Sequence, residues 1–157
     1  MTLLRGKKCG LRSVVSSDVG TILLWENDPA LAPYSDPHEP YTREDIELFI
    51  EQQQAGFKAN GQLRLMIEVS GRAIGAIDLF NYDGHSAEVG VLIYEPQMRR
   101  NGYATDALQS VIAAARSLDI ELLSATISDD NPASQALFRR CGFIKEKNNR
   151  YIYRIEA

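Results

Sequence analysis

Residues Tyr94–Leu108 read YEPQMRRNGYATDAL and connect two segments of different periodicity. The segment before them, AEVGVLIY (87–94), is typical of a strand, and TDALQSVIAAARSL (105–118) is typical of a helix. If the helix begins near Tyr103, the amides of residues 100–105 lack intrahelical acceptors and carry the positive end of the helix dipole. A helix start of this kind binds anions.

The residues of this turn suit a diphosphate. Gly102 permits close approach to the backbone, Ala104 keeps the next turn small, and Arg99 and Arg100 add positive charge. The Gly-x-x-x-x-Gly-Lys-Ser/Thr pattern of a nucleotide-binding P-loop is missing from the sequence. The alternative interpretation is a basic surface turn that only joins a strand to a helix.

The order of elements predicts a mixed α/β domain. A strand at 10–15 precedes a helix capped by Ser16–Asp18, and a proline-rich loop leads to a second helix that starts at Thr42 with Asp45 in a capping box. Three strands at hairpin spacing follow, at 63–69, 72–82 and 87–94. After the helix at 105–118 we expect a strand at 121–128, a helix ended by Gly142, and a closing hairpin. This order excludes a regular βαβ dinucleotide-binding fold.

Composition narrows the class of protein. The 157 residues are 45% hydrophobic and 24% charged, which predicts a single globular domain, 1–157. No apolar run is long enough to span a bilayer, and the N-terminus lacks the pattern of a signal peptide, so we expect a cytoplasmic protein without a membrane partner. Two cysteines and two histidines at unrelated positions predict no metal site.

Charge favours a small substrate over nucleic acid. The formal net charge is −4, which argues against a nucleic-acid partner. Between Glu26 and Glu51 the acidic residues far outnumber the basic ones, of which Arg43 is the single example. This region is either a solvated surface or an acidic rim that attracts an amine.

The turn and its flanking segments resemble the GCN5-related N-acetyltransferase (GNAT) superfamily. RRNGYA (99–104) matches the motif Gln/Arg-x-x-Gly-x-Gly/Ala. AEVGVLIYEPQMR (87–99) and DNPASQALFRRCGF (130–143) are similar to the branch that contains spermidine acetyltransferases and ribosomal-protein N-terminal acetyltransferases. The resemblance covers nearly the whole chain. It implies one largely antiparallel sheet that splays near the coenzyme, flanked by about four helices.

The resemblance also implies which residues bind acetyl-CoA, the expected co-substrate. Strand residues whose backbone would pair with pantetheine are Val91, Leu92 and Ile93. The pyrophosphate turn comprises Arg99, Arg100, Asn101, Gly102, Tyr103, Ala104 and Thr105. Asn131 and Ser134, at the start of the next helix, are further coenzyme candidates.

Acetyl transfer to an amine requires removal of a proton from an ammonium, for which a carboxylate is the natural base. Glu88, in the strand that leads to the turn, is the first candidate, although it also suits a purely structural position. The backbone N–H of Val91 is a candidate oxyanion donor. Asp78, Tyr34 and Tyr82 are candidate substrate-binding residues.

Phe138 departs from the family pattern, in which a tyrosine often stands before the closing Gly-Phe and protonates the leaving thiolate. Phenylalanine has no proton to donate. Ser134, Tyr103, another tyrosine or water must supply it, or the thiolate leaves without help.

The sequence therefore predicts an acetyl-CoA-dependent N-acetyltransferase that acts by direct attack in a ternary complex. A polyamine is the favoured acceptor and a protein N-terminus the next, and a homodimer is the default assembly. Two alternatives remain: a non-catalytic acyl-CoA-binding or sensor protein, and a module that binds protein tails without acetylating them.

Overall fold

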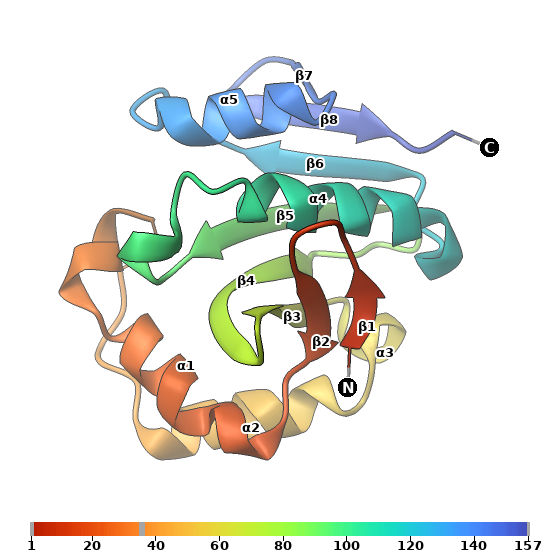
Figure 1. The fold of residues 1–157 in the computed structure, drawn as a ribbon. Helices are drawn as coiled ribbons and strands as arrows, with labels where there is room; N and C mark the ends of the chain where they lie inside the picture. The colour runs from red at the N-terminus through yellow and green to blue at the C-terminus, as the bar shows by residue number, and fades with distance from the viewer. Residues whose placement is uncertain (1, 35–36, 157) are drawn as a thin grey trace.

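The chain forms one eight-stranded sheet in the order β1-β2-β3-β4-β5-β6-β8-β7 (Figure 1). The structure, a computed structural model, describes residues 2–34 and 37–156, without the side chains of residues 2, 3 and 32–34. The strands are β1 (Thr2–Arg5), β2 (Gly10–Ser13), β3 (Leu63–Val69), β4 (Arg72–Phe80), β5 (Ser86–Ile93), β6 (Leu122–Thr126), β7 (Ile144–Lys145) and β8 (Arg150–Arg154). Among the described strands, β5 and β6 form the one parallel pair.

In the described part of the chain, five α-helices and four short 3-10 segments connect the strands. The helices are α1 (Val19–Glu26), α2 (Arg43–Gln53), α3 (Phe57–Asn60), α4 (Tyr103–Ala114) and α5 (Pro132–Arg140). The 3-10 segments are η1 (Ser16–Asp18), η2 (Pro29–Tyr34), η3 (Pro96–Met98) and η4 (Ala115–Leu118). Within these ranges, no helix has the length and the apolar character needed to cross a membrane.

The expected mixed α/β fold is confirmed, and so are several local signals. Thr42 caps α2 by accepting from Asp45 N–H at 3.2 Å, while the Asp45 carboxylate accepts from Thr42 N–H at 2.8 Å. The three central strands and the closing hairpin lie where alternation placed them. Strand β1 and the short helix α3 were not predicted, because each has only four residues and so shows no clear period.

The helices pack on both faces of the sheet. One core cluster joins the α4 and α5 side to strand residues such as Leu65, Ile77, Val89 and Ala125. A second cluster joins α1 and α2 to the other face of the sheet at Met66. Because side chains alternate along a strand, Glu88 and Gly90 belong to the α1/α2 face, opposite Val89.

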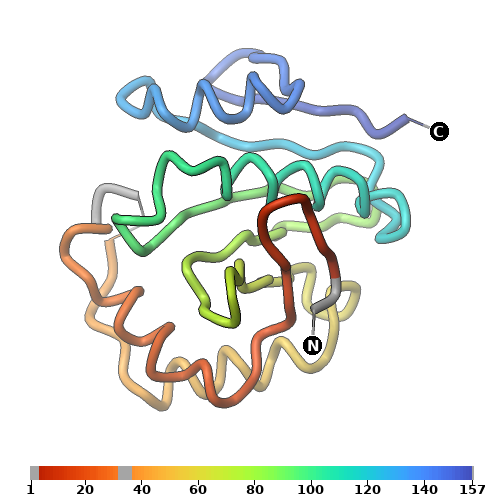
Figure 2. Tube along the Cα trace, in the orientation of Figure 1, coloured from red at the N-terminus to blue at the C-terminus, as the bar shows by residue number. Residues whose placement is uncertain are grey.

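The N-terminal hairpin is fastened to the first turn of α4, which it touches in the chain trace (Figure 2). The Asp106 carboxylate accepts from the backbone N–H groups of Lys7, Lys8 and Cys9 at 2.9, 2.9 and 3.0 Å. Burial opposes ionisation of Asp106, but these bonds outweigh it and lower its pKa. The same carboxylate and burial raise the pKa of Cys9 to about 12, so the thiol stays protonated.

Candidate active site

Strands β5 and β6 pair over only three residues and then part (Figure 1). Their pairs are Ser86 with Leu122, Ala87 with Leu123, and Glu88 with Ser124. On its other edge β5 stays paired with β4 as far as Ile93. The β6 side of β5 beyond Glu88 therefore presents backbone groups with no strand beside them, which suits an extended ligand that carries amides. This gap is the splay that the family resemblance implied.

Glu88 stands at the closed end of the gap, in the last pair before the strands part. Glu88 is paired with Phe80 on β4 and with Ser124 on β6, and we call such a set of laterally paired residues a row. Asn81 Nδ2 donates to Glu88 Oε2 at 2.6 Å. Asn81 adopts a left-handed backbone, with φ of 52°, which asparagine tolerates better than most residues. The carboxylate is thus oriented rather than loose on the surface.

Gly90 leaves room on the same face, just beyond Glu88. A Cβ built on Gly90 would have Phe80 Cε1 as its nearest neighbour, at an ordinary 3.8 Å. Glycine is therefore not required there by packing. The open space lies beside the gap, where a reacting group would pass close to Glu88.

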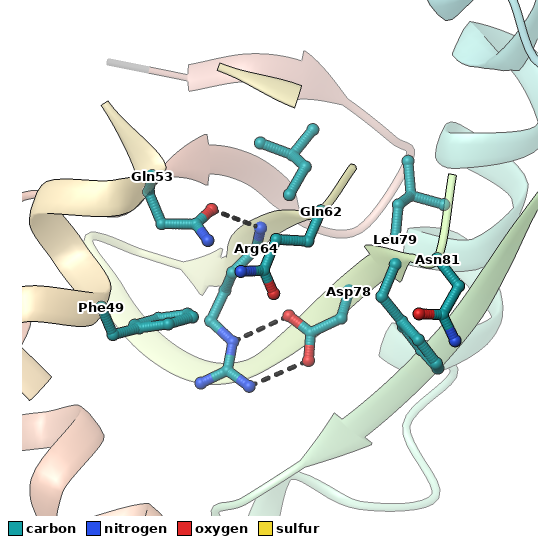
Figure 3. Close-up of a pocket in the computed structure, with 9 residues that line it drawn as sticks. Phe49, Gln53, Gln62, Arg64, Asp78, Leu79 and Asn81 are labelled. Atoms are coloured by element: carbon teal, nitrogen blue, oxygen red, sulfur yellow. Dashed lines mark hydrogen bonds and ion pairs between the residues drawn. The ribbon is translucent and has the colours of Figure 1, made fainter. Parts of the chain in front are cut away.

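A pocket of about 300 Å³ adjoins Glu88 through Asn81 (Figure 3). Its lining residues come from α2, β3, β4 and the segments beside them, and are Phe49, Gln53, Gln62, Leu63, Arg64, Asp78, Leu79, Phe80 and Asn81. The register places Asp78 opposite Gly90, two residues along β5 from Glu88 and on the same face of the sheet. The pocket therefore opens next to the proposed base, on the α1/α2 face of the sheet.

Arg64 dominates the electrostatics of this pocket. Its guanidinium binds Asp78 through two bonds of 2.7 and 2.9 Å and Glu26 at 2.9 Å, and it lies 5.1 Å from the centre of the Phe49 ring. Burial alone would lower the pKa of Arg64, but the attraction of these carboxylates raises it. Asp78 is thus paired within the chain, and Arg64, Asp78 and Glu26 together carry one net negative charge beside the pocket.

The expected pyrophosphate turn has the geometry of an anion-binding helix start. Helix α4 begins at Tyr103, as predicted, and its first backbone bond joins Asp106 N–H to Gly102 C=O at 3.0 Å. The amides of residues 103–105 therefore precede the hydrogen-bond ladder. Arg100 and Gly102 both adopt positive φ, 63° and 83°, which makes the turn tight.

Lys8 brings a third cation to this turn from the N-terminal hairpin. Its Nζ donates to Asn101 C=O at 2.8 Å and would lie 2.9 Å from a Cβ at Gly102. The missing side chain of Gly102 therefore makes room for Lys8 as well as for a ligand. The ammonium is held beside the amides of α4, where negative charge would be stabilised.

Two arginines are fixed around the turn in different ways. Arg99 Nε donates to Ile93 C=O at 2.9 Å, so this side chain lies along the end of β5. The Ile93 carbonyl therefore already accepts a hydrogen bond from within the chain. Arg140, at the end of α5, donates to Thr105 Oγ1 at 3.1 Å and ties the two helices together. The cationic side of the site is therefore built from three separate segments of the chain.

Helix α5 starts and ends as the sequence predicted. Asn131 is its N-cap and accepts from Ser134 N–H at 3.2 Å, so these two candidates lie together at the open end of the gap. Gly142 follows the helix with φ of 99°. Phe138 is buried and packs edge-on against Phe143, with ring centres 4.9 Å apart.

Tyr82 does not join the other candidate substrate residues. Its ring packs on Phe57, with centres 4.5 Å apart, and its hydroxyl donates to Asp119 C=O at 2.9 Å. These contacts give Tyr82 a role in holding α3 and the end of η4. The side chain of Tyr34 lies outside the described part of the chain.

The acidic 26–51 region is largely engaged in local contacts. Glu26 binds Arg64, Asp28 accepts from Ala30 N–H at 2.9 Å, and Asp45 caps α2. Glu47 lies 3.9 Å from Arg43. These contacts support the interpretation of a structured, solvated surface over that of an acidic rim.

Comparison with known proteins identifies the family to which the chain belongs. Residues 8–144 match the acetyltransferase (GNAT) domain, and the chain belongs to this family and is an N-acetyltransferase. An acetyltransferase of Yersinia enterocolitica is 26% identical over 125 residues, which cover 78% of this chain and 77% of that protein.

Solved structures share the fold at low identity. Spermidine N-acetyltransferase from Vibrio cholerae, in complex with CoA and spermine, is 19% identical with a TM-score of 0.79, over 94% of this chain and 96% of that one. The ribosomal L7/L12 α-N-protein acetyltransferase RimL, in complex with coenzyme A, is 17% identical with a TM-score of 0.80, over 96% of each chain.

Sequence reasoning missed four residues that shape the site: Lys8, Asn81, Arg64 and Arg140. Lys8 meets Asn101 across 93 positions of the sequence, and Arg140 meets Thr105 across 35. No local pattern signals contacts of that kind. The Arg64–Asp78 pair had a weak signal, because opposite charges occurred on two adjacent predicted strands at facing positions.

Proposed function

We propose that this chain transfers the acetyl group of acetyl-CoA to a primary amine by direct attack in a ternary complex. One observation carries the proposal: β5 and β6 part at Glu88, and Asn81, which orients the Glu88 carboxylate, lines a pocket on the side of the sheet that α1 and α2 cover. The coenzyme would enter along the gap and the amine from the pocket. The thioester and the amine would then meet beside Glu88, in the last pair before β5 and β6 part.

The residues around the gap fit such a coenzyme. The turn before α4 offers helix-start amides and the nearby cations Lys8, Arg99 and Arg100 to a diphosphate. The free edge of β5, which includes Val91 and Leu92, offers backbone groups to the amides of pantetheine. Asn131 and Ser134 border the open end of the gap.

The proposed acetyl transfer uses a general base for the amine and a hydrogen-bond donor for the carbonyl oxygen of the thioester. The thioester supplies an acyl group activated toward attack. Glu88 takes a proton from the ammonium, directly or through water, and so generates the neutral amine. The N–H of Val91, on the unpaired stretch of β5, donates to the carbonyl oxygen as negative charge develops there. The Asn81 bond holds Glu88 in place for this step.

The lining of the pocket supports a peptide N-terminus as the acceptor. The sequence suggested a polyamine from the acidic 26–51 region, and the neighbour from Vibrio cholerae is a spermidine acetyltransferase. In this chain, however, Arg64 holds Asp78 and Glu26 in ion pairs, so both carboxylates are already engaged and the three groups together carry only one net negative charge. The amide and aromatic lining from Gln53, Gln62 and Phe49 suits a peptide N-terminus.

The variant Glu88→Gln tests the proposal. We expect turnover to fall by about 10²-fold or more, because the general base is lost, while acetyl-CoA binding measured by calorimetry stays unchanged. Glu47→Gln, an exposed change on α2, is the matched control and should retain full activity. Wild-type turnover in Glu88→Gln would remove Glu88 from the mechanism.

A further inference from the structure

The chain contains one buried hydroxyl that the fold does not use. Among the described residues, Tyr151 Oη is the single buried side-chain polar atom without a hydrogen-bond partner. Tyr151 is 0% exposed and belongs to the core cluster between the sheet and the α4/α5 layer. Buried hydroxyls are normally paired, because an unpaired one loses its bonds to water without replacement. A buried hydroxyl without a hydrogen-bond partner requires an explanation.

The strand register places Tyr151 level with the closed end of the gap. Tyr151 pairs with Ala125 on β6, and Ala125 directly follows Ser124, the last β6 residue paired with β5. On β5, Val89 directly follows Glu88, the last residue paired with β6. Tyr151 and Ala125 thus form one row, and Val89 belongs with them to the core cluster on the α4/α5 face.

In this row, the position between Tyr151 and the gap is held by a residue with a small side chain. Ala125 is the intervening residue on β6, and a tyrosine side chain is longer than the spacing of about 4.8 Å between neighbouring strands. The Arg139 guanidinium lies 5.7 Å from the centre of the Tyr151 ring, where it would stabilise negative charge on the phenol.

Glu88 and Tyr151 therefore flank the closed end of the gap from opposite faces. Glu88 occupies the last paired row on the α1/α2 face, and Tyr151 the next row on the α4/α5 face. Ser134 and Tyr103, two other candidate donors, stand at the starts of α5 and α4, near the open end. Phe138 carries no donor. An amine arriving past Glu88 would expel the thiolate toward Tyr151.

We propose that Tyr151 is the general acid of the acetyl transfer and donates its phenolic proton to the departing sulfur of CoA. This inference rests on the proposed function. The amine nitrogen forms a bond to the carbonyl carbon, the carbon–sulfur bond breaks, and its electron pair remains on sulfur. Sulfur takes the Tyr151 proton. The attacking nitrogen loses its second proton as the amide forms, and this proton restores the phenol of Tyr151, while Glu88 releases to solvent the proton that it took before the attack.

Tyr151→Phe removes the hydroxyl and nothing else. We expect kcat to fall by about 10²-fold or more with little change in KM for acetyl-CoA, while the melting temperature stays equal or rises, because no hydrogen bond is lost. Tyr153→Phe is the matched control on the same strand and face, and should retain its kcat. In the double variant Tyr151→Phe/Phe138→Tyr, a donor on α5 should restore part of the lost rate.

A binding measurement tests the contact without turnover. Tyr151→Phe should weaken binding of CoA but leave binding of desulfo-CoA, which lacks the sulfur, unchanged. Wild-type kcat in Tyr151→Phe, or equal losses of affinity for both ligands, would overturn the assignment. Failure of the wild-type protein to bind CoA would instead contradict the proposed function.

Discussion

Asn81 Nδ2 lies 2.6 Å from Glu88 Oε2 and orients the carboxylate at the point where β5 and β6 part. The contact joins the end of β4 to the start of the gap, and Asn81 also lines the neighbouring pocket. One short bond thus connects the proposed base to the proposed acceptor site. Asn81 is a positioning residue because it acts through Glu88.

Asn81→Gly should reduce activity without reducing stability. Glycine adopts the positive φ of this position freely, so only the donor is lost. A hydrogen bond to a charged group is worth about 1.5–3 kcal/mol, and about 1.4 kcal/mol is tenfold in rate, so kcat should fall about tenfold or more. Steady-state kinetics and thermal unfolding measure the two effects. Asn148→Gly, also at positive φ, is the control, and equal kcat in both variants would contradict the role of Asn81.

Gly90→Ala should fold normally and lose activity. The added methyl meets Phe80 at an ordinary 3.8 Å, so packing tolerates it, but it fills the space beside Glu88. We expect kcat/KM to fall at least about tenfold, since small displacements of reacting groups are costly. In the control Gly20→Ala, at an exposed position of helix α1, the new methyl has nothing within 4 Å. Unchanged kcat/KM in Gly90→Ala would show that the reaction does not use this space.

Asp106→Asn should lower stability at neutral pH and much less in acid. The depressed pKa of Asp106 means that its stabilisation is present above the ordinary aspartate pKa, about 3.9, and is lost as pH falls through the lower folded value. We expect a loss of about 1.5–3 kcal/mol in urea unfolding at pH 7. The difference from wild type should shrink toward pH 2. A constant difference at both pH values would contradict an ionised anchor.

Gly102→Val should weaken coenzyme binding in addition to straining the turn. Valine at φ of 83° costs about 1–2 kcal/mol, and its Cβ would displace Lys8 Nζ from beside the turn. Gly84→Val is the matched control, because Gly84 has φ of 92° with nothing within 4 Å of its Cβ. Calorimetry should show at least about tenfold weaker acetyl-CoA binding in Gly102→Val alone, since one lost cation contact is worth more than 1 kcal/mol. Equal affinities in the two variants would refute the model of the turn.

The sequence was informative wherever a local rule decides the structure. Alternation located β3, β4 and β5, the Thr42 capping box located α2, and the glycine of RRNGYA located the start of α4. Each of these signals lies within a few residues of the element it specifies. The position of the turn before α4 was predictable for the same reason, and its coenzyme-binding role belongs to the proposed function.

The electrostatics of the acceptor pocket was not predictable in this way. A count of acidic residues between 26 and 51 suggested an acidic rim, but Glu26 meets Arg64 across 38 positions and Asp78 meets Arg64 across a sheet register. Only folding reveals which charges are paired. The role of Tyr151 likewise depends on the place where β5 and β6 part, which no local pattern specifies.

The most direct test of the central claim is release of free CoA thiol from acetyl-CoA in the presence of single amines. The panel holds short peptides with free N-termini, spermidine, spermine and an aminoglycoside. We predict thiol release with the peptides, at a rate that exceeds the rate with the polyamines, because Asp78 and Glu26 are already paired with Arg64 and offer little to the further positive charges of a polyamine. Absence of release with every amine, while the protein binds acetyl-CoA tightly, would contradict acetyl transfer to a small amine at Glu88.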